Sequence, residues 1–253
     1  MYFDLQKANM YKRISAFLFD IIILGIVVAG VGFLLSDTLN YDSYLASLEN
    51  SYAEYEEKYG IEFEISGEEY EKLSLEKQES YNEAYEALTG DDEVMKTYGI
   101  VVNLTLVIIS ISILAGYLIM EFFIPLYLKN GQTLGKKIFG IGVMHVSGIR
   151  ITPVLLFIRT VLGKYTLETM VPVLIVMMIF FNTVGLPGTV ILGLILLVQI
   201  ILVITTKTNS FIHDILAKTV VVDMASQMIF DDGAALLAYK KELHAEEVSR
   251  SDY

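Results

Sequence analysis

Three long apolar runs constrain the fold of this chain more than any other feature of its sequence. They cover residues 14–35, 100–128 and 169–204, and they contain few charged side chains. A helix needs about twenty apolar residues to cross the hydrocarbon core of a bilayer. The whole chain is 54% hydrophobic with a mean hydropathy of +0.55, above the usual range for a soluble domain. The sequence therefore predicts an all-α integral membrane protein.

The three runs divide into four predicted transmembrane helices. The first two cover residues 12–35 and 99–128. The third run is too long for one span and is interrupted by Gly, Pro and Asn at residues 182–188, so it predicts two short helices at 167–183 and 187–206. No small-residue cleavage site follows the first run, which we interpret as an uncleaved span.

Basic residues predict how the chain is oriented, because Lys and Arg are enriched in cytoplasmic segments. They gather at the N-terminus, in the connection 129–166 and just after the fourth span, at Lys7, Lys12, Arg13, Lys129, Lys136, Lys137, Arg150, Arg159, Lys164, Lys207 and Lys218. Both termini are therefore predicted in the cytoplasm, including the tail 207–253. The expected location is the plasma membrane of a bacterium, in a multi-pass arrangement.

The segment 36–98 carries the acidity of the chain, with eighteen Asp or Glu and four Lys or Arg. It is predicted to lie outside the cytoplasm. Its apolar side chains recur every three or four residues, at Tyr41, Tyr44, Leu48, Tyr52, Tyr55 and Tyr59 and then at Tyr70, Leu73, Tyr81, Tyr85 and Leu88. The spacing predicts an extracytoplasmic acidic helical hairpin.

Three local signals mark the ends of these two helices. Residues 60–66 supply the break, Ser66 and Glu69 form a capping-box pattern, and Gly90 is a helix stop. Two interpretations of the hairpin remain open. It is either a spacer that packs on itself or a surface that binds a protein partner or attracts cations.

The connection 129–166 is predicted to be a cytoplasmic interfacial segment. Residues 139–151 have the form of a β-hairpin with a turn at Ser147 and Gly148. Thr152 and Pro153 then open a helix that ends near residue 162 and is too short to span a membrane. We expect this helix to lie along the inner interface, with basic side chains against anionic lipid headgroups at Lys136, Lys137, Arg159 and Lys164.

Ionisable residues inside the predicted spans are costly, about 2.5 to 3.5 kcal/mol for an Asp at a helix centre. Asp20 lies seven residues beyond Arg13 in the first span, and Glu121 lies at a comparable depth in the second. The two carboxylates are positioned to share a proton or to flank a cation. Asp214, on a short helix after the fourth span, is the natural partner of Arg13, either as a structural ion pair or as a gate.

Four ordered motifs carry a resemblance to a known family. They are Lys12-Arg13-Ile-Ser-Ala-Phe-Leu-Phe-Asp20, the segment from Asn130 to Val143, Arg159, and the segment from His213 to Val222. This pattern resembles the RDD family of membrane proteins, whose name denotes one Arg and two Asp, here Arg13, Asp20 and Asp214. The four spans would form one domain of that family, and the long segment 36–98 departs from its usual compact pattern.

The resemblance implies a function, because some RDD proteins are linked to the exchange of sodium or other monovalent cations for protons. Asp20 would then be the proton or cation site, Arg13 and Asp214 its inner gate, and Glu121 a candidate second ligand. Such a transporter is expected to form at least a homodimer. Gly25 and Ala29 offer a close-packing face, either between subunits or within one.

The alternative is a membrane adaptor or regulator without transport activity, whose outer hairpin binds an envelope protein. No enzymatic activity is predicted, because the chain has no Cys, no H-E-x-x-H motif and three scattered His residues. Residues 131–137 lack the spacing and the final Ser or Thr of a phosphate loop. We therefore predict no cofactor, no metal site and no nucleic-acid partner.

Overall fold

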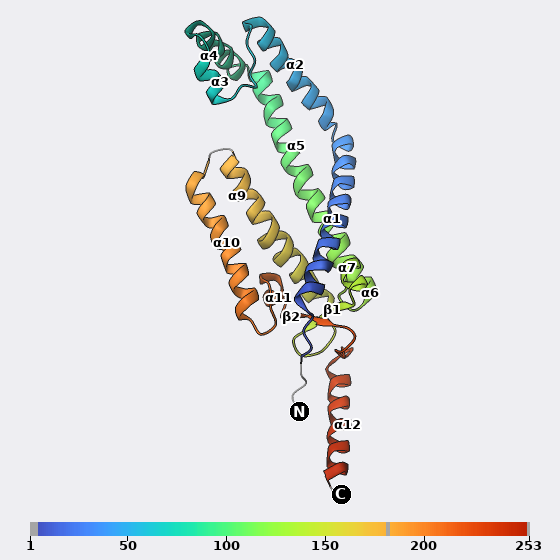
Figure 1. The fold of residues 1–253 in the computed structure, drawn as a ribbon. Coiled ribbons are helices and arrows are strands. Elements are labelled where there is room, and N and C mark those ends of the chain that lie inside the picture. Colours follow the sequence, from blue (N-terminus) through green and yellow to red (C-terminus); the bar gives the residue numbers. More distant parts are fainter. Residues whose placement is uncertain (1–4, 181–182, 252–253) are drawn as a thin grey trace. The chain divides into compact units, whose positions relative to one another are not determined.

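The computed structural model describes residues 5–180 and 183–251. The chain forms two compact units. Unit 1 contains Met1–Val28 and Ile113–Tyr253, and unit 2 contains Ala29–Ser112. Two long helices, α1 (Met10–Thr38) and α5 (Asp92–Tyr117), run through the boundaries between the units (Figure 1).

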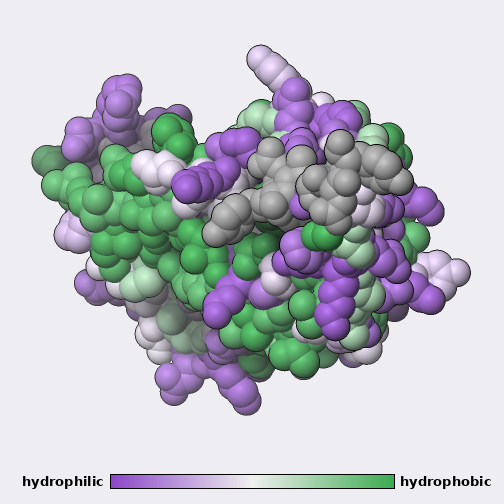
Figure 2. Space-filling model, turned by 90° about the horizontal axis from the view of Figure 1, so that it is seen from below, coloured by the Kyte–Doolittle hydropathy of each residue, from purple (hydrophilic) through white to green (hydrophobic). Residues whose placement is uncertain are grey.

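The described part of the chain contains four helices long and apolar enough to cross a membrane. They are α1; α5 continued by η1 (Leu118–Phe123) and α6 (Ile124–Leu128); α8 (Pro153–Phe157) continued by η2 (Ile158–Met170) and α9 (Val171–Phe180); and α10 (Gly185–Thr205). Large apolar side chains on them are exposed, among them Phe17 at 58% and Ile200 at 59%. Figure 2 shows broad hydrophobic areas on one face of the molecule. Surfaces of this kind are expected where side chains face lipid.

The third of these helices differs from the prediction. Instead of a short interfacial helix and a separate span, one continuous helix of 28 residues runs from Pro153 to Phe180. It begins as expected, since Thr152 Oγ1 accepts a hydrogen bond from Leu155 N. It continues through its polar stretch because Arg159 and Lys164 find partners inside the protein. The predicted turn at 182–188 and the end of the predicted span 167–183 include residues outside those described.

The fold is largely helical, as predicted, but a two-stranded sheet changes the predicted β-hairpin. Strand β1 (Ile141–His145) pairs antiparallel with β2 (Thr219–Asp223), from Ile141 opposite Asp223 to His145 opposite Thr219. The predicted turn is present, but within the described residues the predicted partner segment contributes just the isolated bridge of Met144 to Arg150 and the hydrogen bond from His145 N to Ile149 O at 2.9 Å. Strand β2 prevails because its run of Val residues packs with β1 in the buried core of unit 1.

Unit 2 contains α2 (Tyr41–Tyr59), α3 (Gly67–Lys72) and α4 (Leu75–Thr89) together with the N-terminal part of α5. The capping box at Ser66 and Glu69 is confirmed, with both reciprocal hydrogen bonds present. The second predicted helix is split in two, because the Ser74 side chain accepts from Lys77 N and starts α4. Leu48 and Leu88 share their core with Val94 and Val101 of α5, so the core extends beyond the predicted hairpin.

Two short helices and one longer helix complete unit 1. Helices α7 (Leu134–Ile138) and α11 (Ile212–Leu216) lead into β1 and β2 respectively, and α12 (Gly233–Ser251) follows the sheet (Figure 1). The first two position the charged residues described next.

Candidate functional site

The first part of the site is a cluster of three basic side chains around Glu121 on η1. Lys136 Nζ of α7 lies 3.4 Å from Glu121 Oε2, and Arg159 Nη1 of η2 lies 3.8 Å from the same oxygen. Lys164 Nζ donates a short hydrogen bond to Glu121 Oε1. Burial, with Lys164 and Arg159 adding to it, lowers the pKa of Lys136 to about 8 in spite of Glu121.

The second part surrounds Asp214 on α11, which is 1% exposed. Arg159 Nε and Nη2 donate to Asp214 Oδ1 at 3.1 and 2.9 Å, and Thr219 Oγ1 donates to the same oxygen at 3.1 Å. Arg13 Nη2 and His213 Nε2 each lie 3.6 Å from Asp214 Oδ2. Burial alone would raise the pKa of Asp214, but His213, Arg159 and Arg13 outweigh it and hold that pKa well below its usual value.

Arg159 joins these two parts. It is 2% exposed and lies within ion-pair distance of both Glu121 and Asp214. Because a buried charge is costly unless it is paired, this one guanidinium ties the second apolar helix, the third and α11 into a single network.

The third part is Asp20 on α1, and its partners are neutral. Thr133 Oγ1 donates a hydrogen bond to Asp20 Oδ2, and Gly135 N donates to Asp20 Oδ1 at 2.8 Å. A Cβ on Gly135 would lie 2.4 Å from Ala16 O, so only Gly allows this close approach. Among the described residues, no Lys, Arg or His nitrogen lies within 4.0 Å of this carboxylate.

His213 forms a further contact between α11 and η2. Its Nδ1 lies 2.7 Å from Glu168 Oε2, and its backbone N donates to Glu168 Oε1 at 3.0 Å. Burial lowers the pKa of His213, although Asp214 and Glu168 oppose that shift. Gly163 makes the contact possible, because a Cβ there would lie 2.5 Å from His213 Cβ.

The structure places Arg13 and Asp214 within 3.6 Å, the pairing that the sequence suggested. It gives Asp20 and Glu121 separate sets of partners, so they are not arranged as a pair. Of the four basic residues expected at lipid headgroups, only Lys137 is exposed. The expectation for Lys136, Arg159 and Lys164 was wrong because buried carboxylates are available to neutralise them.

Three members of the network are not predicted from the sequence, namely Thr133, Glu168 and His213. A signal for Glu168 existed, because a carboxylate next to an apolar run needs a partner. Thr133 gave no signal, since a Thr before a short helix is ordinary capping chemistry, and its side chain also accepts from Lys136 N. Among the described residues, no group of three or more His, Asp or Glu is arranged to hold a metal ion.

Four apolar helices and a buried ion-paired network that links three of them define an integral membrane protein with charged groups held inside its helical bundle. The chain belongs to the RDD family, whose family model matches residues 7–218. The matched range contains Arg13, Asp20, Glu121, Arg159 and Asp214. No curated protein and no solved structure matches the chain.

Proposed function

We propose that this protein exchanges a monovalent cation for protons across the plasma membrane, with Asp20 as the group that carries the proton or the cation. The observation that supports this proposal is that Asp20 and the other buried acids differ in the charge of their partners. Glu121 and Asp214 have basic partners within 4.0 Å, whereas the partners of Asp20 are a hydroxyl and a backbone N–H. Among the described residues Asp20 has no ion-pair partner within 4.0 Å, and Lys136 acts on it only from a greater distance, so a proton or a cation can be accepted in place of a paired base.

Thr133 supports this role in both protonation states. A hydroxyl donates to an ionised carboxylate and accepts from a protonated one, so its bond to Asp20 persists when the proton arrives. Asp20 is 7% exposed on an apolar helix, where ionisable side chains mark functional sites by default. Both features favour reversible protonation over a purely structural role.

The remaining charges receive other roles in this proposal. Glu121 already has three basic partners, which leaves little negative charge for a cation, so we assign it to structure instead of ion binding. Arg13 and Asp214 form the inner gate. Their 3.6 Å contact is looser than the hydrogen bonds of Arg159 to Asp214, and Asp214 Oδ2 accepts no hydrogen bond from the described residues, so this pair can open without breaking one.

Both termini are proposed to be cytoplasmic, as the distribution of basic residues indicates. A homodimer is part of the proposal, because four spans enclose little room for an aqueous path. Gly25 and Ala29 are exposed on α1, and a Cβ on Gly25 would meet no atom within 4 Å. That open surface suits close packing of a second copy.

Proton flux in liposomes, driven by sodium, potassium or lithium gradients, tests the proposal. Wild type is expected to couple cation and proton movement, and Asp20→Asn to abolish it. Asp231→Asn is the matched control, since the Asp231 side chain is 73% exposed and pairs with Arg150 outside the apolar helices. Unchanged flux in Asp20→Asn would show that Asp20 is not the proton or cation site.

The second candidate function is the membrane adaptor. It is favoured by the acidic surface of unit 2, whose carboxylates have no ion-pair partners among the described residues. Absence of flux from well-folded wild-type protein, with every cation tested, would favour this function over transport.

A further inference from the structure

His213 is the buried imidazole of this chain. The sequence contains three His residues, at 145, 213 and 244. The His213 residue is 7% exposed, whereas His145 is half-buried and His244 is exposed on α12. Imidazole is the side chain whose ordinary charge change falls between pH 5 and 8. A small change of pH can therefore alter a buried charge of unit 1 at His213.

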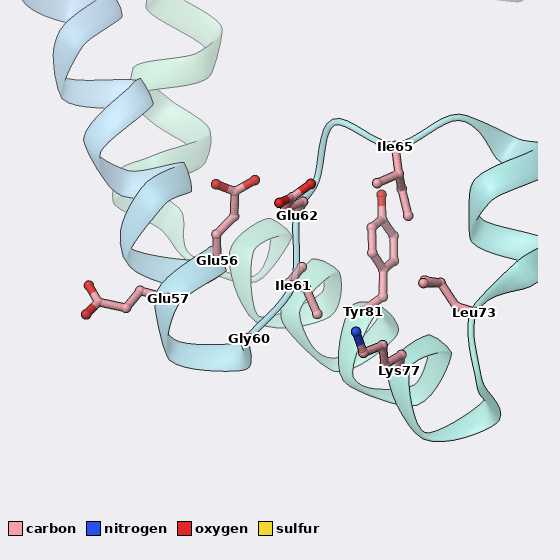
Figure 3. A pocket seen from close by; sticks show the side chains of 9 residues that line it. All are labelled: Glu56, Glu57, Gly60, Ile61, Glu62, Ile65, Leu73, Lys77 and Tyr81. Atoms are coloured by element: carbon pink, nitrogen blue, oxygen red, sulfur yellow. The ribbon is translucent and has the colours of Figure 1, made fainter.

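The charged cavity of unit 2 offers no such group. It has a volume of about 490 Å³, and its lining includes Glu56, Glu57, Glu62 and Lys77 but no His among the described residues. Figure 3 shows Glu57 pointing away from it. Glu57, Glu62 and Lys77 are exposed, so water screens their charges. A structural response to mild acid is therefore expected in unit 1 and not at this cavity.

Two carboxylates face the two ring nitrogens of His213. Nδ1 lies 2.7 Å from Glu168 Oε2, whereas Nε2 lies 3.6 Å from Asp214 Oδ2. A neutral imidazole has one N–H and donates to just one of these carboxylates. The shorter distance places that proton on Nδ1. In the neutral form Nε2 then presents a lone pair to Asp214.

Asp214 Oδ2 is the atom that this arrangement leaves unsatisfied. It is buried and accepts no hydrogen bond from the described residues, whereas Oδ1 accepts from Arg159 and Thr219. Arg13 Nη2 and His213 Nε2 each lie 3.6 Å from Oδ2. Both nitrogens of a charged imidazole donate, so a second proton on His213 would supply the missing donor.

Arg13 and a charged His213 would compete for this oxygen. Both contact Phe211, whose ring stacks on that of His213 with centroids 5.6 Å apart and lies 5.7 Å from the guanidinium carbon of Arg13. Two positive charges brought together in a buried site repel each other. Arg13 Nη1 donates to Asn209 O at 2.7 Å, so Arg13 keeps a partner when it leaves Asp214. Proton binding and the ion pair therefore oppose each other.

The surroundings of His213 place its protonation at mildly acidic pH. The charged groups that face it are Glu168 and Arg159 on η2, Asp214 on α11 and, across Asp214 Oδ2, Arg13 on α1. Burial lowers the pKa of His213 more than Asp214 and Glu168 raise it, and Arg159 lowers it further. The proton is therefore taken up below the ordinary His pKa of about 6.5.

We propose that His213 is the pH-sensing residue of the inner gate, where a second proton lets Nε2 donate to Asp214 Oδ2 and displaces Arg13 from that oxygen. The contact between α1 and α11 loosens as a result. The role of Arg13 and Asp214 as a gate belongs to the proposed transport, so this inference rests on that function. The displacement itself is measurable without transport.

Spin labels on the full chain in detergent measure the contact. The chain has no Cys, so Tyr11→Cys on α1 and Leu216→Cys on α11 supply its two thiols. Tyr11 is 81% exposed and Leu216 45%. Between about pH 7.5 and pH 5, the ratio of longer to shorter distances should rise roughly fivefold, as for one hydrogen bond exchanged. Arg13→Met should show the longer distances already at about pH 7.5. Unchanged distances in the labelled protein would overturn the proposal.

Variants identify the group that takes the proton. His213→Gln should abolish the pH response, whereas the control His244→Gln, exposed on α12, should keep it. Glu168→Gln leaves His213 in place but removes the carboxylate at Nδ1, so the midpoint should move about one pH unit lower. A wild-type response in His213→Gln, or an unchanged midpoint in Glu168→Gln, would overturn the assignment. Circular dichroism keeps a loss of response distinct from a loss of fold.

Cation flux in liposomes separates this inference from the proposed function. Distances that respond to pH through His213, with no flux of any cation, would support the protonation switch and show that the transport function is wrong. Coupled flux in wild type, with distances that do not respond to pH, would leave transport in place and overturn the role of His213.

Discussion

The two units use charge in opposite ways. In unit 1, buried carboxylates are surrounded by basic side chains, as Glu121 is by Lys136, Arg159 and Lys164. In unit 2, most acidic side chains are exposed and none of those described forms an ion pair, and aromatic contacts such as that of Phe63 with Tyr81 hold the helices. The difference follows from solvent, because water screens an exposed charge and an apolar bundle does not.

The largest effect is expected from removing the guanidinium that unit 1 shares between its two clusters. Arg159→Met leaves Asp214 without its closest basic partner and takes one from Glu121. Breaking a buried pair from one side costs about 3 to 5 kcal/mol. The loss is measurable as a lower free energy of unfolding in detergent. A change below 1 kcal/mol would show that these charges are solvated and would erase the contrast between the units.

A smaller effect is expected from adding one methyl group where the network packs most closely. Gly163→Ala places a Cβ 2.5 Å from His213 Cβ, so α11 or η2 has to move. Overpacking of this kind costs about 1 to 3 kcal/mol. Gly193→Ala on α10 is the matched control in an apolar helix, because its Cβ would meet no atom within 4 Å. Thermal unfolding of both variants should separate them clearly, and equal melting temperatures would contradict the packing.

The pH dependence of stability is expected to reveal the lowered pKa of Lys136. Its pKa is about 8 in the folded protein, whereas an ordinary lysine, as in the unfolded chain, has a pKa of 10.5. Between these values the unfolded chain keeps a proton that the folded protein has released, so stability gains from this residue as pH rises through that window. The gain is at most about 3 kcal/mol, since the two pKa values differ by about 2.5 and one pKa unit corresponds to about 1.4 kcal/mol.

The measurement compares unfolding of wild type and Lys136→Met at several pH values between about 8 and 10.5. The difference should shift in favour of wild type as pH rises, and below pH 8 it should stay constant. A constant difference across the whole range would mean that Lys136 titrates as an exposed lysine does.

The smallest effect is expected in unit 2. Neutralising Glu79 and Glu83 by Gln should change the free energy of unfolding by less than about 0.5 kcal/mol per site, because both are exposed and unpaired among the described residues. The same denaturation experiment checks it. A loss comparable to that of Arg159→Met would mean that the acidic surface is structural, and the two units would no longer differ.

Much of the local structure could be predicted from the sequence. The number of apolar helices, the capping box at Ser66 and the helix start at Thr152 depend on neighbours along the chain, and the structure confirms them. The strand partner of Ile141 to His145 could not be predicted. The turn at Gly148 is a local signal in the sequence, whereas the pairing with Thr219 to Asp223 depends on which strand buries more apolar surface. The prediction of a short interfacial helix was wrong for a related reason, because the sequence does not show which partners its polar residues have.

The sequence by itself determined that this is a membrane protein of the RDD family, because length, hydropathy and the ordered motifs are properties of the chain alone. Only the tertiary structure decided what each charge does. Whether a lysine faces lipid or a carboxylate depends on segments far apart in sequence, as Lys164 and Glu121 show. The bilayer and the protein interior both penalise an unpaired charge, so the nearest available partner in space, which sequence order does not give, settles its position.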